Sequence, residues 1–158
     1  MDMTEFRVPT VALIAEIYSA DGRVFRGRIF VPASAPLHAG AERAMEWINE
    51  GGPFFPFLPD DVSTAVIVNK HEVLVMTVAA EADRVDASDE SATPERRVVV
   101  ECGERRFEGG LVIDMPEHHC RVLDYLNRPE PFLVLRAGER HHLVQKARIS
   151  RVLEKLNP

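Results

Sequence analysis

The sequence is poor in the residue types that indicate disulfide bonding or membrane insertion. Its 158 residues include only two cysteines, Cys102 and Cys120. Two cysteines in a chain of this size imply no disulfide framework, so we expect reduced thiols. No run of 18 or more apolar residues occurs, which excludes a membrane-spanning helix. Residues 1–7 carry Asp2 and Glu5 in place of the basic segment of a secretory signal, so we expect a cytoplasmic protein.

The common catalytic and cofactor-binding motifs are also missing. There is no Gly-rich phosphate-binding loop, no nucleophile elbow, no HExxH zinc motif and no spaced pair of CxxC motifs. Acidic pairs such as Asp60 and Asp61 have no partner acid or base at a spacing that indicates catalysis. The sequence therefore predicts a protein that is not an enzyme and that binds no cofactor.

Charge is unevenly distributed along the chain. Residues 1–94 contain 7 basic and 15 acidic residues, a net charge of −8, whereas residues 95–158 contain 12 and 10, a net charge of +2. An acidic protein repels phosphate backbones at long range, so nucleic-acid binding is disfavoured for the whole chain and stays open for the second part. Arginine outnumbers lysine 16 to 3, which favours a bacterial source with a GC-rich genome.

What the sequence does contain is an internal repeat. The matching segments are, in chain order, residues 23–31 with 105–113, 42–49 with 120–127, 53–54 with 131–132, and 67–73 with 143–149. The offset between the segments falls from 82 to 78 and then to 76, so two length changes suffice, and both fall in expected loops. We therefore predict a tandem duplication of one small module.

The repeat divides the chain into three parts. The first module covers residues 6–80 and the second covers residues 96–158. Between them, residues 81–95 are acidic and contain little to bury, so they are predicted to form a flexible linker.

Each module is predicted to contain about five strands and one short helix between the second and third strands. Asp21-Gly22 is a strong signal for a β-hairpin turn, and apolar residues after it alternate with polar ones. The helices, two to three turns long, are expected to stop at Asn49 and Asn127. The predicted strands are residues 11–18, 24–31, 54–58, 64–68 and 73–78 in the first module and 98–102, 107–113, 132–135, 143–144 and 149–153 in the second.

The predicted fold class is mainly β. A small module gains by curling into a barrel of the SH3-like or Sm-like kind, because closure removes exposed strand edges. The alternative is an open sheet that is packed by its helix.

Repeated arginines are candidates for binding a partner. Arg43 and Arg121 occupy equivalent places in the two helical segments. The structural interpretation is an ion pair on the helix surface, because Glu46 and Asp124 follow at i+3. The pattern favours this second interpretation.

Repeated lysines are the other candidates for partner or anion binding. Lys70 and Lys146 are predicted to lie in a tight turn between two strands. A lysine in such a polar turn is usually only solvated, which is what we expect here.

Histidines form the one cluster with metal-ligand chemistry. His118 and His119 precede Cys120, and His141 lies further along the second module, so converging loops would bring together two imidazoles and a thiolate. Adjacent histidines rarely both reach one metal, and the first module has no comparable cluster. We therefore predict no metal site, with His118, His119 and His141 as weak candidates.

The helical segment of the second module also carries a resemblance. Residues 121–127 (RVLDYLN), followed by residues 131–135 (PFLVL), resemble a widespread family of uncharacterised bacterial proteins. Those modules carry a similar Arg-x-x-Asp-aromatic-Leu-Asn segment after a β-hairpin. The similarity covers residues 98–153 well, and the first module departs from it at residues 46–48. The resemblance implies a small β-rich module and no activity.

These observations favour a non-catalytic binding or scaffold protein that engages a protein partner or a second copy of itself. An alternative is an Sm-like nucleic-acid or nucleotide binder that uses the more basic second module. A metal-dependent enzyme that uses His118, His119 and His141 is the third hypothesis.

Overall fold

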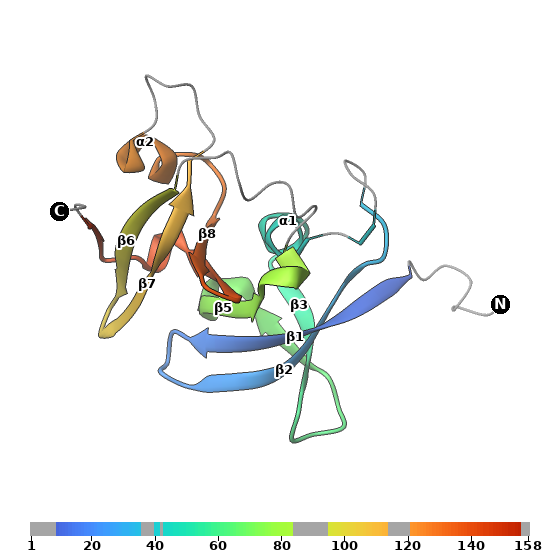
Figure 1. The fold of residues 1–158 in the computed structure, drawn as a ribbon. Coiled ribbons are helices and arrows are strands. Elements are labelled where there is room, and N and C mark those ends of the chain that lie inside the picture. The colour runs from blue at the N-terminus through green and yellow to red at the C-terminus, as the bar shows by residue number, and fades with distance from the viewer. Residues whose placement is uncertain (1–8, 36–39, 42, 84–94, 114–120, 156–158) are drawn as a thin grey trace.

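A computed structural model describes residues 9–35, 40–41, 43–83, 95–113 and 121–155, and antiparallel strands dominate it (Figure 1). We call residues 9–83 the first half and residues 95–155 the second half. The first half contains β1 (Thr10–Ser19), β2 (Val24–Pro32), α1 (Ala44–Asn49), β3 (Phe54–Pro59), β4 (Val66–Asn69), the 3₁₀ helix η2 (Lys70–Glu72), β5 (Val73–Ala79) and η3 (Ala80–Asp83). The second half contains β6 (Glu95–Cys102), β7 (Arg105–Val112), α2 (Val122–Leu126), β8 (Phe132–Ala137), β9 (Arg140–Gln145), η6 (Lys146–Arg148) and β10 (Arg151–Glu154).

The prediction of a mainly β protein is confirmed, but the sheet is not closed. Among the residues that the structure describes, ten strands follow the order β10-β6-β7-β8-β9-β5-β1-β2-β3-β4. Because β5 pairs with β9 of the other half, one edge of each half is covered without closure of a barrel. Within the described ranges the sheet is therefore open, and its two outer strands are β4 and β10.

Both helices are shorter than predicted, at six and five residues for α1 and α2. Helix α1 begins after Arg43, whose backbone N–H donates to the Glu46 carboxylate at 2.9 Å. It ends at Asn49, and Gly51 and Gly52 follow, both of which disfavour helix. Part of the predicted linker is ordered, since η3 extends to residue 83; residues 84–94 lie outside the described residues.

The two halves share one strand order, β5-β1-β2-β3-β4 in the first and β10-β6-β7-β8-β9 in the second. They also share register. Ile17 of β1 faces Met76 of β5, and Val100 of β6 faces Val152 of β10. We call two residues counterparts when they occupy the same position in corresponding strands or helices of the two halves; Met76 and Val152 are one such pair.

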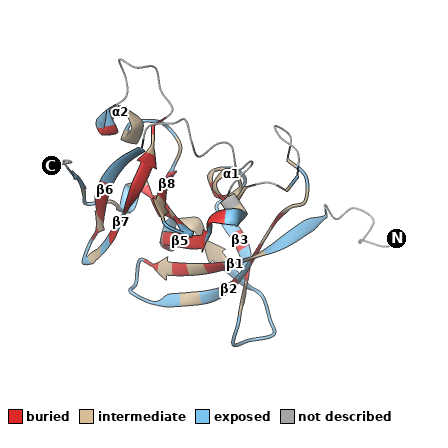
Figure 2. Ribbon diagram, in the orientation of Figure 1, coloured by how far each residue is buried: buried red, intermediate tan, exposed pale blue. Residues whose placement is uncertain are grey.

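Two clusters of buried apolar side chains form the core. The buried residues are coloured red along the strands in Figure 2. The first cluster belongs mainly to the first half but includes Phe132 and Leu143 of the second. The second cluster belongs mainly to the second half but includes Val75 of β5. Each core is thus completed by side chains from the other half.

Candidate functional site

The antiparallel pair of β5 and β9, here called the seam, joins the two halves. Met76 faces Leu143, and Val75 faces Val144, and all four side chains are buried. Successive side chains on a strand point to opposite faces. Accordingly, Met76 and Leu143 pack in the first cluster, whereas Val75 and Val144 pack in the second.

Two side-chain amides fasten the seam. The Oδ1 atom of Asn49 accepts the backbone N–H of Phe132 at 2.8 Å, and its Nδ2 donates to the carbonyl oxygen of Phe132 at 3.2 Å. Asn49 thus pairs with the start of β8 much as a neighbouring strand would. On the other side, Nε2 of Gln145 donates to the carbonyl oxygens of Lys70 at 2.8 Å and Val73 at 2.9 Å.

Two arginines of the second half also reach the first half. Arg148 donates from Nε and Nη2 to the carbonyl oxygen of His71, at 3.0 and 2.6 Å. Arg105 donates to the carbonyl oxygen of Gly22 at 3.2 Å and stacks over the ring of Tyr18, 5.0 Å from the centroid. The seam is therefore held by polar contacts at several points as well as by its apolar side chains.

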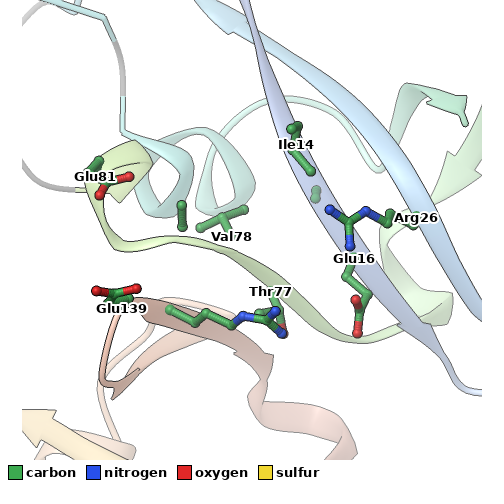
Figure 3. Close-up of a pocket in the computed structure, with 10 residues that line it drawn as sticks. Ile14, Glu16, Arg26, Thr77, Val78, Glu81 and Glu139 are labelled. Carbon is green, nitrogen blue, oxygen red and sulfur yellow. The ribbon is translucent and has the colours of Figure 1, made fainter.

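A cavity of about 310 Å³ lies beside the seam, between β1, β2, β5 and β9 (Figure 3). Its charged lining residues come from both halves and have both signs: Glu16, Glu81 and Glu139 against Arg26 and Arg140. Such a mixed lining does not single out a phosphate or another strong anion. Apolar residues, Ile14, Ala15, Val78 and Ala79, also line the cavity.

The seam also carries His142, which faces Thr77 across the strand pair. Nδ1 of His142 lies 2.7 Å from Oγ1 of Thr77, and its ring packs against Phe107 with centroids 5.2 Å apart. Burial lowers the pKa of His142, and Arg140 lowers it further, whereas Glu16 opposes them. Thr77 is only 5% exposed, so its hydroxyl serves as a buried hydrogen-bonding group.

His142 should make the seam sensitive to acid. Because burial, Arg140 and His141 hold the pKa of His142 below that of the unfolded chain, the unfolded state binds the extra proton and stability rises with pH. The contribution is fully present above the unfolded pKa of about 6.5 and is lost as the pH falls below it. We expect urea unfolding to show a smaller loss of stability from pH 7.5 to 5.5 in His142→Asn than in the wild type.

The control for this experiment is His71→Asn, because His71 is exposed. It shows how far the exchange of an exposed histidine for asparagine by itself changes the measured slope. Equal slopes in the wild type and in His142→Asn would contradict the role given to His142.

The predicted ion pairs of the repeated arginines are confirmed. Nε of Arg43 lies 3.2 Å from Oε1 of Glu46, and Nε of Arg121 lies 2.9 Å from Oδ2 of Asp124. Each pair sits at the start of its helix, and the helices belong to different halves. Partner binding by Arg43 or Arg121 stays a prediction.

The repeated lysines are not merely solvated. Nζ of Lys70 donates to the carbonyl oxygen of Glu50 at 2.6 Å, and Nζ of Lys146 donates to that of Arg128 at 2.9 Å. These carbonyls are counterparts just beyond α1 and α2. Burial lowers the pKa of Lys146. Both lysines therefore tie a turn to the end of a helix, and their binding of a partner stays a prediction.

The metal candidates are not brought together among the residues that the structure describes. His118, His119 and Cys120 lie outside those residues. His141 lies on β9 and is buried, and it points away from His142 because the two are successive on a strand. Within the described ranges, no group of three or more His, Cys, Asp or Glu residues could hold a metal ion.

Cys102 is buried, and burial raises the pKa of its thiol to about 11. Because the thiolate is the reactive form, a thiol with this pKa has a thiolate fraction of about one in a thousand at pH 8. In a Cys120→Ser variant we expect Cys102 to react with Ellman's reagent only slowly until urea unfolds the chain. Reaction at the rate of free cysteine in the folded protein would contradict this, and Cys102→Ser provides the blank.

The outer strands of the sheet carry exposed apolar side chains. On β4, Ile67 is 77% exposed and Val66 is also exposed; beside it on β3, Phe54 is 58% exposed. On β10, Leu153 is exposed. Unpaired strand edges with apolar side chains readily accept another strand, so natural proteins usually protect them. We take β4 and β10 as the candidate interaction site.

The residues that hold the seam were not predicted from the sequence. The sequence pattern predicts that Asn49 stops a helix, and it indicates no role for Gln145. The only signal in the sequence is the repeat, in which Asn49 aligns with Asn127. The alignment does not indicate which of the two asparagines forms hydrogen bonds with a strand.

No protein-family model, no curated protein and no solved structure matches this chain. Among the described residues, none of the helices has the length and apolar character needed to cross a bilayer. The seam and the two open edges are therefore the features of the molecule that indicate a function.

Proposed function

We propose that this protein is a non-catalytic binding or scaffold protein that engages other protein chains by strand addition at the edges of its sheet. The two halves would be copies of one small barrel-like module, with the boundaries 6–80 and 96–158. In such strand addition, backbone hydrogen bonds supply affinity and alternate side chains supply specificity.

The observation that carries the proposal is the seam. There, an edge strand of one half already accepts an edge strand of the other, and the apolar side chains that meet become fully buried. The outer edges β4 and β10 offer the same kind of surface, with Ile67 and Leu153 exposed.

The arginines of the second half give little support to the nucleic-acid alternative. Most of them lie beside carboxylates: the pairs are Arg96 with Glu154, Arg97 with Glu95 and Glu108, Arg106 and Arg151 with Glu101, Arg121 with Asp124, Arg128 with Glu130, and Arg148 with Glu72. Positive charge shared in this way is less available to phosphates. Strand addition is the function that the geometry favours.

Retention of proteins from lysate by the immobilised chain tests the proposal. The comparison is a double variant, Ile67→Lys with Leu153→Lys, in which both edges are blocked. Edge lysines oppose strand pairing. From the cognate lysate, the wild type should retain a protein in stoichiometric amount, its own chain included, and the double variant should not. Equal retention on both, or no retained protein, would overturn the proposal; an unchanged melting temperature shows that the variant is folded.

A further inference from the structure

We propose that β4 of one copy of this chain pairs with β10 of a second copy, in the register of the internal seam. The chain then assembles head to tail through a second, intermolecular seam. This inference rests on the proposed function and names the partner: another copy of the same chain.

The strand order makes the two outer edges complementary. β4 is the counterpart of β9, and β10 is the counterpart of β5, so the open edges are the same two kinds of edge that pair internally. The registers agree as well: Phe54 faces Asn69 on β4, and Phe132 faces Gln145 on β9.

This correspondence fixes which residues would meet. Internally, Met76 faces Leu143 and Thr77 faces His142. The counterpart pairs across two copies are Val152 of β10 with Ile67 of β4, followed by Leu153 with Val66. Every one of these four residues is apolar.

Apolar side chains that are buried at the internal seam have exposed counterparts at the outer edge. Leu143 is 0% exposed, whereas its counterpart Ile67 is 77% exposed. Phe132 is 4% exposed, whereas its counterpart Phe54 is 58% exposed. Leu143 and Phe132 complete the core of the first half. Ile67 and Phe54 are placed to do the same for the second half of another copy.

The receiving side is also present. In the first half, α1 packs against β8, where Met45 is half-buried and Asn49 binds the backbone of Phe132. Their counterparts, Leu123 of α2 and Asn127 directly after it, are both exposed. A β3 segment from another copy would cover Leu123 and present the backbone of its first residue to Asn127.

The charge distribution favours pairing of β4 with β10 over pairing of β4 with β4. Residues 1–94 carry a net charge of −8 and residues 95–158 carry +2. Head-to-tail contact brings the acidic part of one copy to the more basic part of the next, as the internal seam does. Pairing β4 with β4 would instead bring together two acidic parts, which oppose each other.

The intermolecular seam is expected to be weaker than the internal one. On one face of β10, Arg151 forms an ion pair with Glu101 of β6, with Nε of Arg151 2.5 Å from Oε2 of Glu101. Their counterparts, Val75 and Tyr18, are instead packed against the core of the other half. Fewer apolar contacts on that face mean that assembly should depend on concentration. Because β4 and β10 are different surfaces, the contact is heterologous and builds rings or filaments.

Two variants test the inference, each with one edge of the sheet blocked, and they are measured alone and mixed. Ile67→Lys blocks β4, and Leu153→Lys blocks β10; both positions are exposed, so the fold should tolerate them. Val24→Lys is the matched control, because Val24 is exposed on the inner strand β2 and its counterpart is the basic Arg106. Sedimentation and light scattering report the mass, starting from a monomer of 17.7 kDa.

Over concentrations from about 1 μM to 1 mM, the wild type and Val24→Lys should form multiples of the monomer mass. Each edge variant alone should stay monomeric. An equal mixture of the two should form a dimer, because it joins the one free β10 to the one free β4. Asn127→Ala should raise the concentration needed for assembly about tenfold without changing the melting temperature of dilute protein.

Other outcomes would overturn the inference. If a single edge variant still dimerises, the contact joins like edges or lies elsewhere. A second outcome is that the wild type is monomeric at every concentration but retains a protein from lysate that the double edge variant does not retain. The partner is then another protein, and the proposed function stands without self-assembly. If the wild type neither assembles nor retains a protein, both proposals fail.

Discussion

Replacing Gly27 with alanine is expected to lower the free energy of unfolding by about 3 kcal/mol, a fall in Tm on the order of 10 °C for a chain of this size. Gly27 lies on β2, where β3 crosses closely. An added Cβ would overlap the carbonyl oxygen of Leu58 and stand 2.8 Å from its carbonyl carbon and from Cζ of Phe57. Because the main obstacle is backbone, it cannot rotate aside. Urea unfolding measures the loss.

Two other glycines provide the comparison. Gly109 is the counterpart of Gly27, and a Cβ there would overlap the carbonyl oxygen of Arg136, so Gly109→Ala should cost a similar amount. At Gly52 no heavy atom lies within 4 Å, and Gly52→Ala should change stability by no more than about 0.5 kcal/mol. If Gly27→Ala and Gly52→Ala had equal effects, the close approach of β2 and β3 would be contradicted.

Truncation of Leu143 to alanine is expected to cost about 2 to 5 kcal/mol, the usual range for a buried leucine. Leu143 is fully buried at the seam, where it packs with Met76 in the first core cluster. The same truncation at its exposed counterpart, Ile67→Ala, should change the stability of dilute protein by no more than about 0.5 kcal/mol.

This pair of variants tests whether the seam is part of the folding unit. Unfolding followed by circular dichroism, at a concentration low enough to keep the chain monomeric, gives both values. If Leu143→Ala were as mild as Ile67→Ala, the two halves would fold without the help of the seam.

The strands could be predicted from the sequence because their signals are local. The alternation along residues 24–31 and the Asp21-Gly22 turn each involve neighbouring residues, and Gly22 does adopt a positive φ of 92°. Most predicted strands are found within a few residues of their expected bounds. The same holds for the ion pairs of Arg43 and Arg121, whose partners lie three residues away.

The seam could not be predicted, because it depends on which edge meets which. Ile67 and Leu143 are both apolar residues on strands, and sequence pattern alone gives them the same environment. Asn49 and Asn127 likewise look alike as helix stops, yet Asn49 binds a residue 83 positions away. The sheet is not closed for the same reason: the sequence indicates that strand edges need cover, and the other half supplies that cover for β5 and β9.

The roles of the lysines escaped prediction because their acceptors are distant in sequence. Lys70 binds a carbonyl 20 residues earlier, and Lys146 binds one 18 residues earlier. The repeat drew attention to both residues. Only the folded chain shows that each one secures a turn to the end of a helix.

The pairing of β5 with β9 has a consequence for synthesis on the ribosome. β5 ends at residue 79 and β9 ends at residue 145, so 145 − 79 = 66 further residues must be made before the seam can close. At about 5 to 20 residues per second, that delay is roughly 3 to 13 seconds. During it, the edge of β5 is available to the β9 strand of a neighbouring nascent chain. Slower translation of the second half should therefore increase the yield of intertwined dimers, in which two chains exchange their C-terminal halves.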